Sequence, residues 1–236
     1  MPDYSAAPLL PALTFILVEP ARQTNIGAAA RAIKAMGFSE LRITGAGRAD
    51  TEAYWVAHHS QDILDQVAYF GTLEAALSDV DFSIATSARD RAVKRHYMPP
   101  EQAASVIAAK TASIGRAALV FGRESSGLRN DEIDLCDAVS SVPLAQAQPS
   151  LNLGQAVMLY AWCLHRVRRT IADADGADPA AYRAARERLI SLLATTGLDQ
   201  HRALGGWLLE RLALADDYDL GMLMTLLERL APVQTP

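Results

Sequence analysis

The chain has 236 residues, 50% of them hydrophobic and 21% charged, which predicts a folded protein with a sizeable core and argues against wholesale disorder. No apolar run is long enough to span a membrane, and residues 1–15 lack the basic region of a secretory signal. Cys136 and Cys163 are the only cysteines, so neither a disulfide framework nor a zinc site is expected. These features predict a cytoplasmic protein with two buried thiols.

The net charge of −5 is unevenly distributed. Residues 171–236 hold ten acids and six arginines, whereas residues 1–170 hold 17 acids and 16 lysines or arginines. An acidic chain is not typical of nucleic-acid binding. However, residues 88–96 carry four cations against one acid, and residues 165–169 add three arginines. Such runs are either solvated faces or, if they flank one cleft, candidate phosphate contacts.

Hydrophobic periodicity predicts strands and helices that alternate along the first 170 residues. The expected strands are residues 14–20, 40–44, 67–70, 80–87, 116–122 and 138–144. The expected helices are residues 25–38, 50–65, 72–79, 99–110, 130–136 and 150–169. This alternation predicts an α/β fold, with a parallel sheet covered by helices on both faces.

The last third of the chain has a different pattern. Residues 171–180 are rich in Ala, Asp, Gly and Pro and predict a linker. Helices are expected at residues 181–195, 200–214 and 218–231. The chain is therefore divided into an α/β domain (1–170), the linker (171–180) and a helical extension (181–236). Apolar residues at helical spacing in the extension should be buried, against each other or against a partner subunit, and the linker would let them pack separately from the α/β domain. They are Leu189, Leu192, Leu193, Trp207, Leu208, Leu212, Leu223, Leu226, Leu227 and Leu230.

Polar and glycine-rich segments follow three of the predicted strands. Parallel sheets bind ligands at the carboxyl ends of their strands, and here those ends read "EPARQTNIGAAAR", "GRESSGLRNDE" and "PLAQAQPSLN". Neither a dinucleotide-binding glycine motif nor a P-loop follows any strand. Gly122 and Gly127 would let the backbone approach a ligand. Taken singly, each residue has an ordinary structural explanation, and only their occurrence together at three strand ends indicates a site.

The start of the last helix of the α/β domain is unusual. Ser150 can cap it, because a serine oxygen accepts a hydrogen bond from an N–H of the first turn. Asn152 is a poor helix former, and its position suggests a role beyond the fold.

Three segments resemble, in order and spacing, the signature motifs of the SpoU/TrmH family. They are "NIGAAARAIKAMGF", "LVFGRESSGL" followed by "NDE", and "VPL…SLNLGQAV". The resemblance covers about residues 13–170. It implies an S-adenosylmethionine-dependent RNA 2′-O-ribose methyltransferase of the SPOUT class. The resemblance also implies that the C-terminal part of the sheet domain forms a deep trefoil knot and that the protein is a homodimer. The match is closest to the TrmJ type, which methylates tRNA at nucleotide 32. An rRNA substrate, or a non-catalytic RNA-binding protein that keeps the knot, remains an alternative.

The resemblance also implies site residues. The cofactor would contact Thr86, Ser87, Gly122, Arg123, Glu124, Gly127, Val142, Pro143, Leu144, Ser150, Leu151 and Asn152. The catalytic set would be Asn25, Arg31, Glu124, Ser150 and Asn152, and the RNA would contact Arg22, Arg31, Arg89, Arg91, Lys94 and Arg95. A guanidinium does not readily lose a proton, so Arg31 is expected to clamp a phosphate and stabilise the developing oxyanion. No metal is expected. Two features depart from the family. Gln148 stands where a tyrosine is common, and the extension lacks an arginine-rich helix.

Overall fold

The computed structural model describes residues 10–87, 97–111, 113–146, 150–167, 179–215 and 217–230. These residues form a seven-stranded sheet in the order β3-β2-β1-β6-β4-β7-β5, and its six neighbouring pairs are all parallel. The strands are β1 (Ala12–Val18), β2 (Glu40–Thr44), β3 (Ala68–Phe70), β4 (Phe82–Ser87), β5 (Tyr97–Met98), β6 (Arg116–Phe121) and β7 (Ala138–Ser141). The predicted parallel α/β sheet is confirmed. Only the two-residue strand β5 was not expected.

The helices alternate with the strands as predicted. They are α1 (Gln23–Ala35), α2 (Thr51–Ala57), α3 (Gln61–Asp65), α4 (Leu73–Ala76), α5 (Pro100–Ala109), α6 (Asn130–Asp134) and α7 (Leu153–Val167). The single helix expected at residues 50–65 is wrong. The chain is broken there at His58 and His59, whose φ angles of 30° and 50° are incompatible with a right-handed helix.

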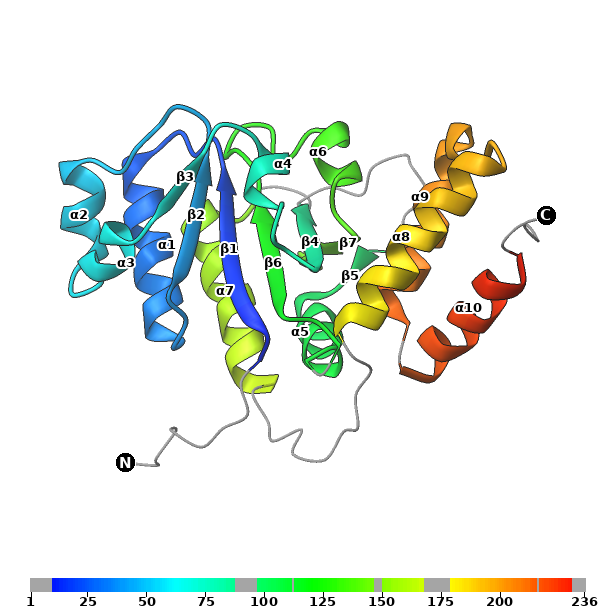
Figure 1. The fold of residues 1–236 in the computed structure, drawn as a ribbon. Helices are drawn as coiled ribbons and strands as arrows, with labels where there is room; N and C mark the ends of the chain where they lie inside the picture. The colour runs from blue at the N-terminus through cyan, green and yellow to red at the C-terminus, as the bar shows by residue number, and fades with distance from the viewer. Residues whose placement is uncertain are drawn as a thin grey trace.

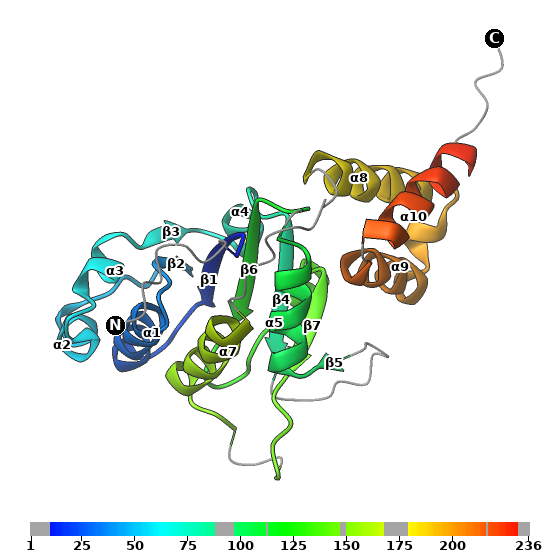
Figure 2. The same ribbon diagram turned by 90° about the horizontal axis from the view of Figure 1, so that it is seen from below.

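Each face of the sheet has its own apolar core, because alternate side chains of a strand point to opposite sides. Phe15 and Leu17 of β1 belong to the core beneath α1, α5 and α7, whereas Ile16 and Val18 pack with residues of α4 and α6. Figure 2 shows α7 between α1 and α5 on one side of the sheet, with α4 on the other. A Cβ on Gly154 would lie 2.7 Å from the Cβ of Ala28, so glycine lets α7 approach α1 closely.

Three further helices follow the sheet domain: α8 (Pro179–Thr195), α9 (Arg202–Leu214) and α10 (Asp217–Leu230), with a short 3₁₀ turn at Leu198–Gln200. They lie beyond the β7–β5 edge of the sheet (Figure 1). Of residues 171–180, only Pro179 and Ala180 lie within the described part of the chain, and there they begin α8. None of the described helices is long and apolar enough to cross a membrane.

The helical extension does not pack separately, so that expectation is wrong. Tyr182 of α8 is buried in the same apolar core as Phe82 of β4. Arg183 pairs with Asp81 at 2.8 Å, next to the start of β4. Trp207 and Leu226 are about half exposed in the single chain, at 48% and 51%, so their burial against a partner subunit stays a prediction.

Candidate active site

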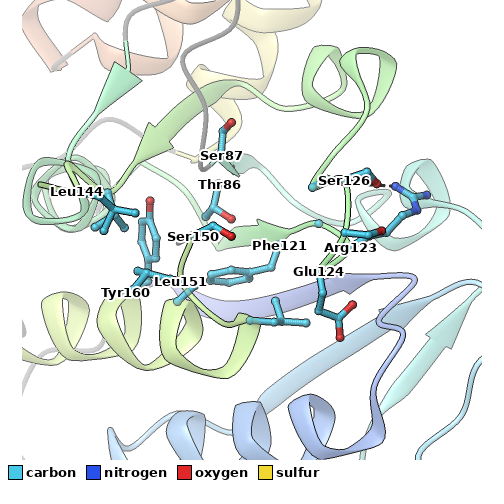
Figure 3. A pocket seen from close by; sticks show the side chains of 16 residues that line it. Thr86, Ser87, Phe121, Arg123, Glu124, Ser126, Leu144, Ser150, Leu151 and Tyr160 are labelled. Atoms are coloured by element: carbon cyan, nitrogen blue, oxygen red, sulfur yellow. Dashed lines mark hydrogen bonds between the residues drawn. The ribbon is translucent and has the colours of Figure 1, made fainter. Parts of the chain in front are cut away.

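A pocket lies at the carboxyl ends of β4 and β6, closed by the segment after β7 and the start of α7 (Figure 3). Its lining includes Thr86, Ser87, Gly122, Arg123, Glu124, Gly127, Val142, Leu144, Ser150 and Leu151, all of which were expected to contact a cofactor. Pro143 and Asn152 were expected there too, but neither lines this pocket. The second and third motifs thus meet at this pocket, whereas no residue of the first motif lines it.

Six lining residues were not anticipated: Phe121, Ser125, Ser126, Leu153, Ala156 and Tyr160. The two serines stand inside the "GRESSG" motif, which was the available signal. The residues of α7 recur at helical spacing, a pattern that by itself indicates only burial. The Tyr160 hydroxyl donates to Ser140 Oγ at 2.8 Å, and Ser140 donates to the Met98 carbonyl at 2.8 Å. Burial raises the pKa of Tyr160 well above its usual value, so it remains a neutral phenol.

The wall formed by residues 122–128 needs glycine at two positions. A Cβ on Gly122 would come within 2.2 Å of the Gly127 carbonyl carbon and the Leu128 nitrogen, so only glycine lets the loop fold back on the end of β6. Gly127 has a φ of 68°, and its N–H donates to the Arg123 carbonyl at 2.8 Å. The result is a tight turn whose two glycines line the pocket.

A chain of hydrogen bonds joins the three motifs. Asn25 donates through Nδ2 to Glu124 Oε1 at 2.8 Å, and its Oδ1 accepts from Asn152 Nδ2 at 2.8 Å. Asn25 is only 4% exposed. Its amide is therefore buried and hydrogen-bonded within the protein rather than exposed to solvent.

Glu124 organises the start of α1. Its carboxylate accepts from the backbone N–H groups of Ala21 at 2.9 Å and Arg22 at 3.1 Å, in addition to Asn25. Burial raises the pKa of Glu124, but the hydrogen bonds from Ala21, Asn25 and Arg22 together outweigh it, and the pKa lies below the usual value. An ionised carboxylate at a helix N-terminus is also favoured by the helix dipole.

Asn152, and not Ser150, caps α7. The Asn152 Oδ1 accepts from the Gly154 N–H at 2.8 Å, and the Asn152 N–H donates to Gln155 Oε1 at 3.1 Å. This reciprocal arrangement is a variant of the capping box, because Asn152 bonds to the second helical residue and Gln155, the third, bonds back. The predicted cap by Ser150 is wrong, because the helix begins at Leu153. Ser150 is exposed and lines the pocket instead.

The Arg123 side chain points away from the middle of the pocket. Figure 3 shows its guanidinium directed away from Thr86, Ser150 and Tyr160. It donates to Glu19 Oε2 at 2.8 Å and to both oxygens of Glu132, at 3.0 and 2.9 Å.

Arg31 lies in a second cavity, a groove between α1, α2 and α7. The groove is lined by Ala28, Arg31, Ala32, Ala35, Val56, Leu151, Asn152, Gly154, Gln155, Met158, Leu159 and Trp162. Leu151 lines both the groove and the pocket, so segment 150–152 separates the two. Within the described ranges, no residue forms a hydrogen bond or ion pair with the Arg31 guanidinium.

Of the other predicted RNA contacts, only Arg22 lies within the described residues. Arg22 is exposed immediately before α1. Arg89, Arg91, Lys94 and Arg95 lie outside the described residues, as do Gln148 and most of the predicted linker. Among the residues that are described, no three His, Cys, Asp or Glu side chains gather in a way that could hold a metal ion.

Two solved structures are similar to this one over different lengths. TrmJ from Z. mobilis superposes with a TM-score of 0.65 and 28% identity, covering 94% of this chain and 99% of that one. The SpoU methyltransferase AviRb from Streptomyces viridochromogenes, solved in complex with AdoMet, gives a TM-score of 0.52 at 20% identity, covering 70% of this chain and 62% of that one. The latter likeness supports the fold alone.

Curated relatives cover most of the chain. An uncharacterized tRNA/rRNA methyltransferase LasT from Escherichia coli is 46% identical over 91% of this chain and 95% of its own. A tRNA (cytidine-2′-O-)-methyltransferase TrmJ from Methanocaldococcus jannaschii is 40% identical over 68% of this chain and 71% of its own. Residues 179–231 match the C-terminal domain of tRNA/rRNA methyltransferase LasT, and residues 12–162 match the SpoU rRNA Methylase family. With this match over more than half of its length, and with the three motifs joined by hydrogen bonds, the chain belongs to the SpoU methylase family.

Proposed function

We propose that this protein transfers the methyl group of S-adenosylmethionine to a ribose 2′-hydroxyl of tRNA, at nucleotide 32 of the anticodon loop. The enzyme class, an RNA 2′-O-methyltransferase, follows from family membership and from relatives of the TrmJ type. The observation that carries the proposal is the hydrogen-bonded chain Glu124–Asn25–Asn152, which has the pocket on one side and the Arg31 groove on the other.

The residues of the pocket fit the cofactor. Gly122 and Gly127 leave the loop backbone open to an adenosyl group, and Thr86 and Ser150 offer hydroxyls near it. Phe121, Leu144 and Tyr160 provide apolar surface for a purine or ribose. When bound, S-adenosylmethionine supplies a methyl group activated by a positively charged sulfur.

The chain itself must position the nucleophile and manage its charge. Holding two reactants in line can lower a barrier by on the order of 7–11 kcal/mol at best. Arg31 would bind a phosphate through its fork and stabilise negative charge on the 2′-oxygen. Ser150, exposed at the border of the pocket, would orient the hydroxyl. Asn25, Glu124 and Asn152 would act by fixing the start of α1, which bears Arg31, against segment 150–152.

The same proposal includes the knot and the homodimer implied by the family. The passage of the chain from β7 to α7, which packs between α1 and α5, is consistent with threading of the C-terminal segment. The groove between α1 and α7 exposes Met158 and Trp162, at 37% and 47%, and a second copy of the chain would cover them. The exposed basic residue Arg22 and the basic run at 88–96 would contact RNA.

An rRNA substrate is the second candidate. It is favoured by the match of residues 179–231 to the C-terminal domain of a tRNA/rRNA methyltransferase. The extension has a net charge of −4 from residue 171 onward and lacks an arginine row, so it is not expected to supply the main phosphate contacts of either substrate.

One experiment tests the substrate. The purified protein is incubated with labelled S-adenosylmethionine and either total tRNA or rRNA, and the 2′-O-methylated nucleotide is mapped by mass spectrometry. Methylation of tRNA at nucleotide 32 supports the proposal, and methylation confined to rRNA supports the second candidate. If calorimetry on folded protein detects no binding of S-adenosylmethionine or its demethylated product, both are wrong.

A further inference from the structure

We propose that Arg123 is a positioning residue of the methyl-transfer site, and that its guanidinium, held between Glu19 and Glu132, fixes the loop wall of the cofactor pocket. We call these three residues the clamp. The inference rests on the proposed function, since it takes the pocket to be the cofactor site. It replaces a direct role for the Arg123 side chain in cofactor binding with an indirect one.

The clamp joins elements on both sides of the loop. Glu19 follows β1, Glu132 lies in α6, and Arg123 itself belongs to the wall at residues 122–128. The Arg123 Nε contacts the Glu19 carboxylate, Nη1 contacts that of Glu132, and Nη2 contacts both, at 2.7–3.0 Å. A planar fork can bridge two carboxylates in this way, whereas a lysine ammonium is a single point donor.

Burial distinguishes Arg123 from its neighbour Arg129. The Arg123 side chain is 14% exposed and that of Glu132 only 5%, so their pairing is shielded from solvent. Arg129 also reaches Glu132, at 2.8 Å, but its side chain is 56% exposed. Exposed ion pairs contribute little, whereas a buried carboxylate that loses its partner is strongly destabilised. Arg129 is therefore a matched control on the same carboxylate.

The clamp also holds an unusual backbone conformation at Glu19. Its φ of 45° is unusual for a residue other than glycine and costs free energy that the surroundings must offset. The bonds from Arg123 hold the Glu19 side chain in this turn. Two residues later the chain reaches Ala21, whose N–H donates to Glu124. Adjacent residues of the loop, Arg123 and Glu124, thus tie the pocket wall to the segment that starts α1.

The Arg123 guanidinium is poorly placed to contact a cofactor directly. Its donors are already used, and Figure 3 shows the group turned away from the Thr86 and Ser150 side of the pocket. Direct binding would require the guanidinium to leave the buried carboxylate of Glu132. Burial raises the pKa of Glu132, but the hydrogen bonds from Arg123 and Arg129 outweigh this effect, with Arg123 contributing most, and the pKa lies below its usual value.

The test compares Arg123→Lys with Arg129→Lys in the full-length protein. Hydrogen exchange of peptides covering residues 122–128 is measured without cofactor, and affinity for S-adenosylhomocysteine is measured by calorimetry. We expect Arg123→Lys to speed exchange of the loop and to weaken binding about tenfold, which corresponds to the loss of one charge-assisted hydrogen bond. Arg129→Lys should change neither quantity by more than about twofold.

Kinetics separate positioning from a merely structural effect. With Arg123→Lys, KM for S-adenosylmethionine should rise about tenfold while kcat at saturating cofactor and RNA stays within about threefold of the parent. A loss of folded protein alone would lower kcat and leave KM unchanged. If Arg123→Lys does not fold, Glu19→Gln removes the more exposed half of the clamp and should produce the same changes on a smaller scale.

Two results would overturn the inference. One is unchanged loop exchange with a greater than about 100-fold loss of affinity, which would make Arg123 a direct ligand of the cofactor. The other is Arg123→Lys behaving like Arg129→Lys in every measurement. Because the exchange experiment needs neither cofactor nor RNA, it judges the clamp even if the wild-type protein methylates no RNA and the proposed function fails.

Discussion

Arg31 is the residue on which the proposed chemistry depends most. It lines the groove, on the other side of segment 150–152 from the pocket. We therefore expect Arg31→Lys to retain affinity for S-adenosylhomocysteine within about twofold while methyl transfer falls on the order of 100-fold, since a point charge cannot replace the fork. Calorimetry and single-turnover methylation measure the two effects. Near-normal methyl transfer by Arg31→Lys would remove Arg31 from the catalytic role.

The Glu124 carboxylate should make the free energy of unfolding depend on pH in the acidic range. Its pKa in the folded protein lies below the ordinary value of 4.5, so its contribution is fully present above that pH and is lost as the pH falls through the folded pKa. We expect wild-type protein to lose more unfolding free energy than Glu124→Gln when the pH is lowered from neutral to below about 4.5. Urea denaturation at several pH values measures this. Parallel curves for the two proteins would contradict it.

For single residues, the sequence predicted which residues line the pocket better than it predicted which contacts each side chain makes. The family resemblance implied that Thr86, Gly122 and Leu144 contact a cofactor, and all three line the pocket. The motifs could not reveal that Arg123 turns toward Glu19 and Glu132, because those partners come from other elements and the direction of a side chain depends on tertiary packing. Asn152 was recognised as unusual, but its capping role depends on where α7 starts, which periodicity locates only approximately.

The start of α7 gives a prediction at the scale of an element. Asn152 caps the helix and also donates to Asn25, so Asn152→Ala removes a cap and leaves a buried acceptor without its partner. We expect a loss of about 2 kcal/mol or more in unfolding free energy. Ser150→Ala is the control, and because Ser150 is exposed and precedes the cap, its loss should stay within about 0.5 kcal/mol. Equal losses for the two variants in urea denaturation would contradict this assignment.

Among the elements, some strands were predicted to within one residue at each end, whereas β1 begins and ends two residues earlier than predicted. The strand at residues 40–44 matches at both ends. The elements that were missed are set by local geometry or long-range pairing. Strand β5 has two residues and exists because it pairs with β7. The break between α2 and α3 depends on positive φ angles at His58 and His59, and no glycine marks it.

The proposed homodimer is a prediction at the scale of the whole molecule. Trp162 lies in the groove between α1 and α7 with 47% of its surface exposed, and Trp207 on α9 is 48% exposed outside it. We expect Trp162→Glu to shift the protein toward monomer in sedimentation at micromolar concentration, because a charge would be buried in the interface. Trp207→Glu should leave the wild-type association unchanged. A monomeric wild-type protein, or the opposite pattern for the two variants, would contradict the dimer.

The position of the extension could not be predicted from the sequence, because a linker composition says nothing about which surface the next helix covers. Tyr182 and Ala185 of α8 are buried against the sheet domain, with Arg186 also pairing with Asp137 at 3.2 Å. Lys110, at the end of α5, lies 4.8 Å from the Tyr182 ring and donates to the Ala215 carbonyl at 3.1 Å. These contacts make the extension part of the same cooperative structure as the sheet.

A single unfolding transition is therefore expected, and Tyr182 tests it. Tyr182→Ala should lower the free energy of unfolding by about 3–5 kcal/mol, and the transition should stay single, since the lost ring packs against the sheet domain. Tyr182→Phe should cost little or even stabilise, because the Tyr182 hydroxyl is buried without a hydrogen-bond partner among the described residues, and the Phe ring keeps the contact with Lys110. Calorimetry and urea denaturation of both variants measure these effects. If the wild-type protein unfolds in two steps and Tyr182→Ala affects only the first, the extension is an independent domain after all.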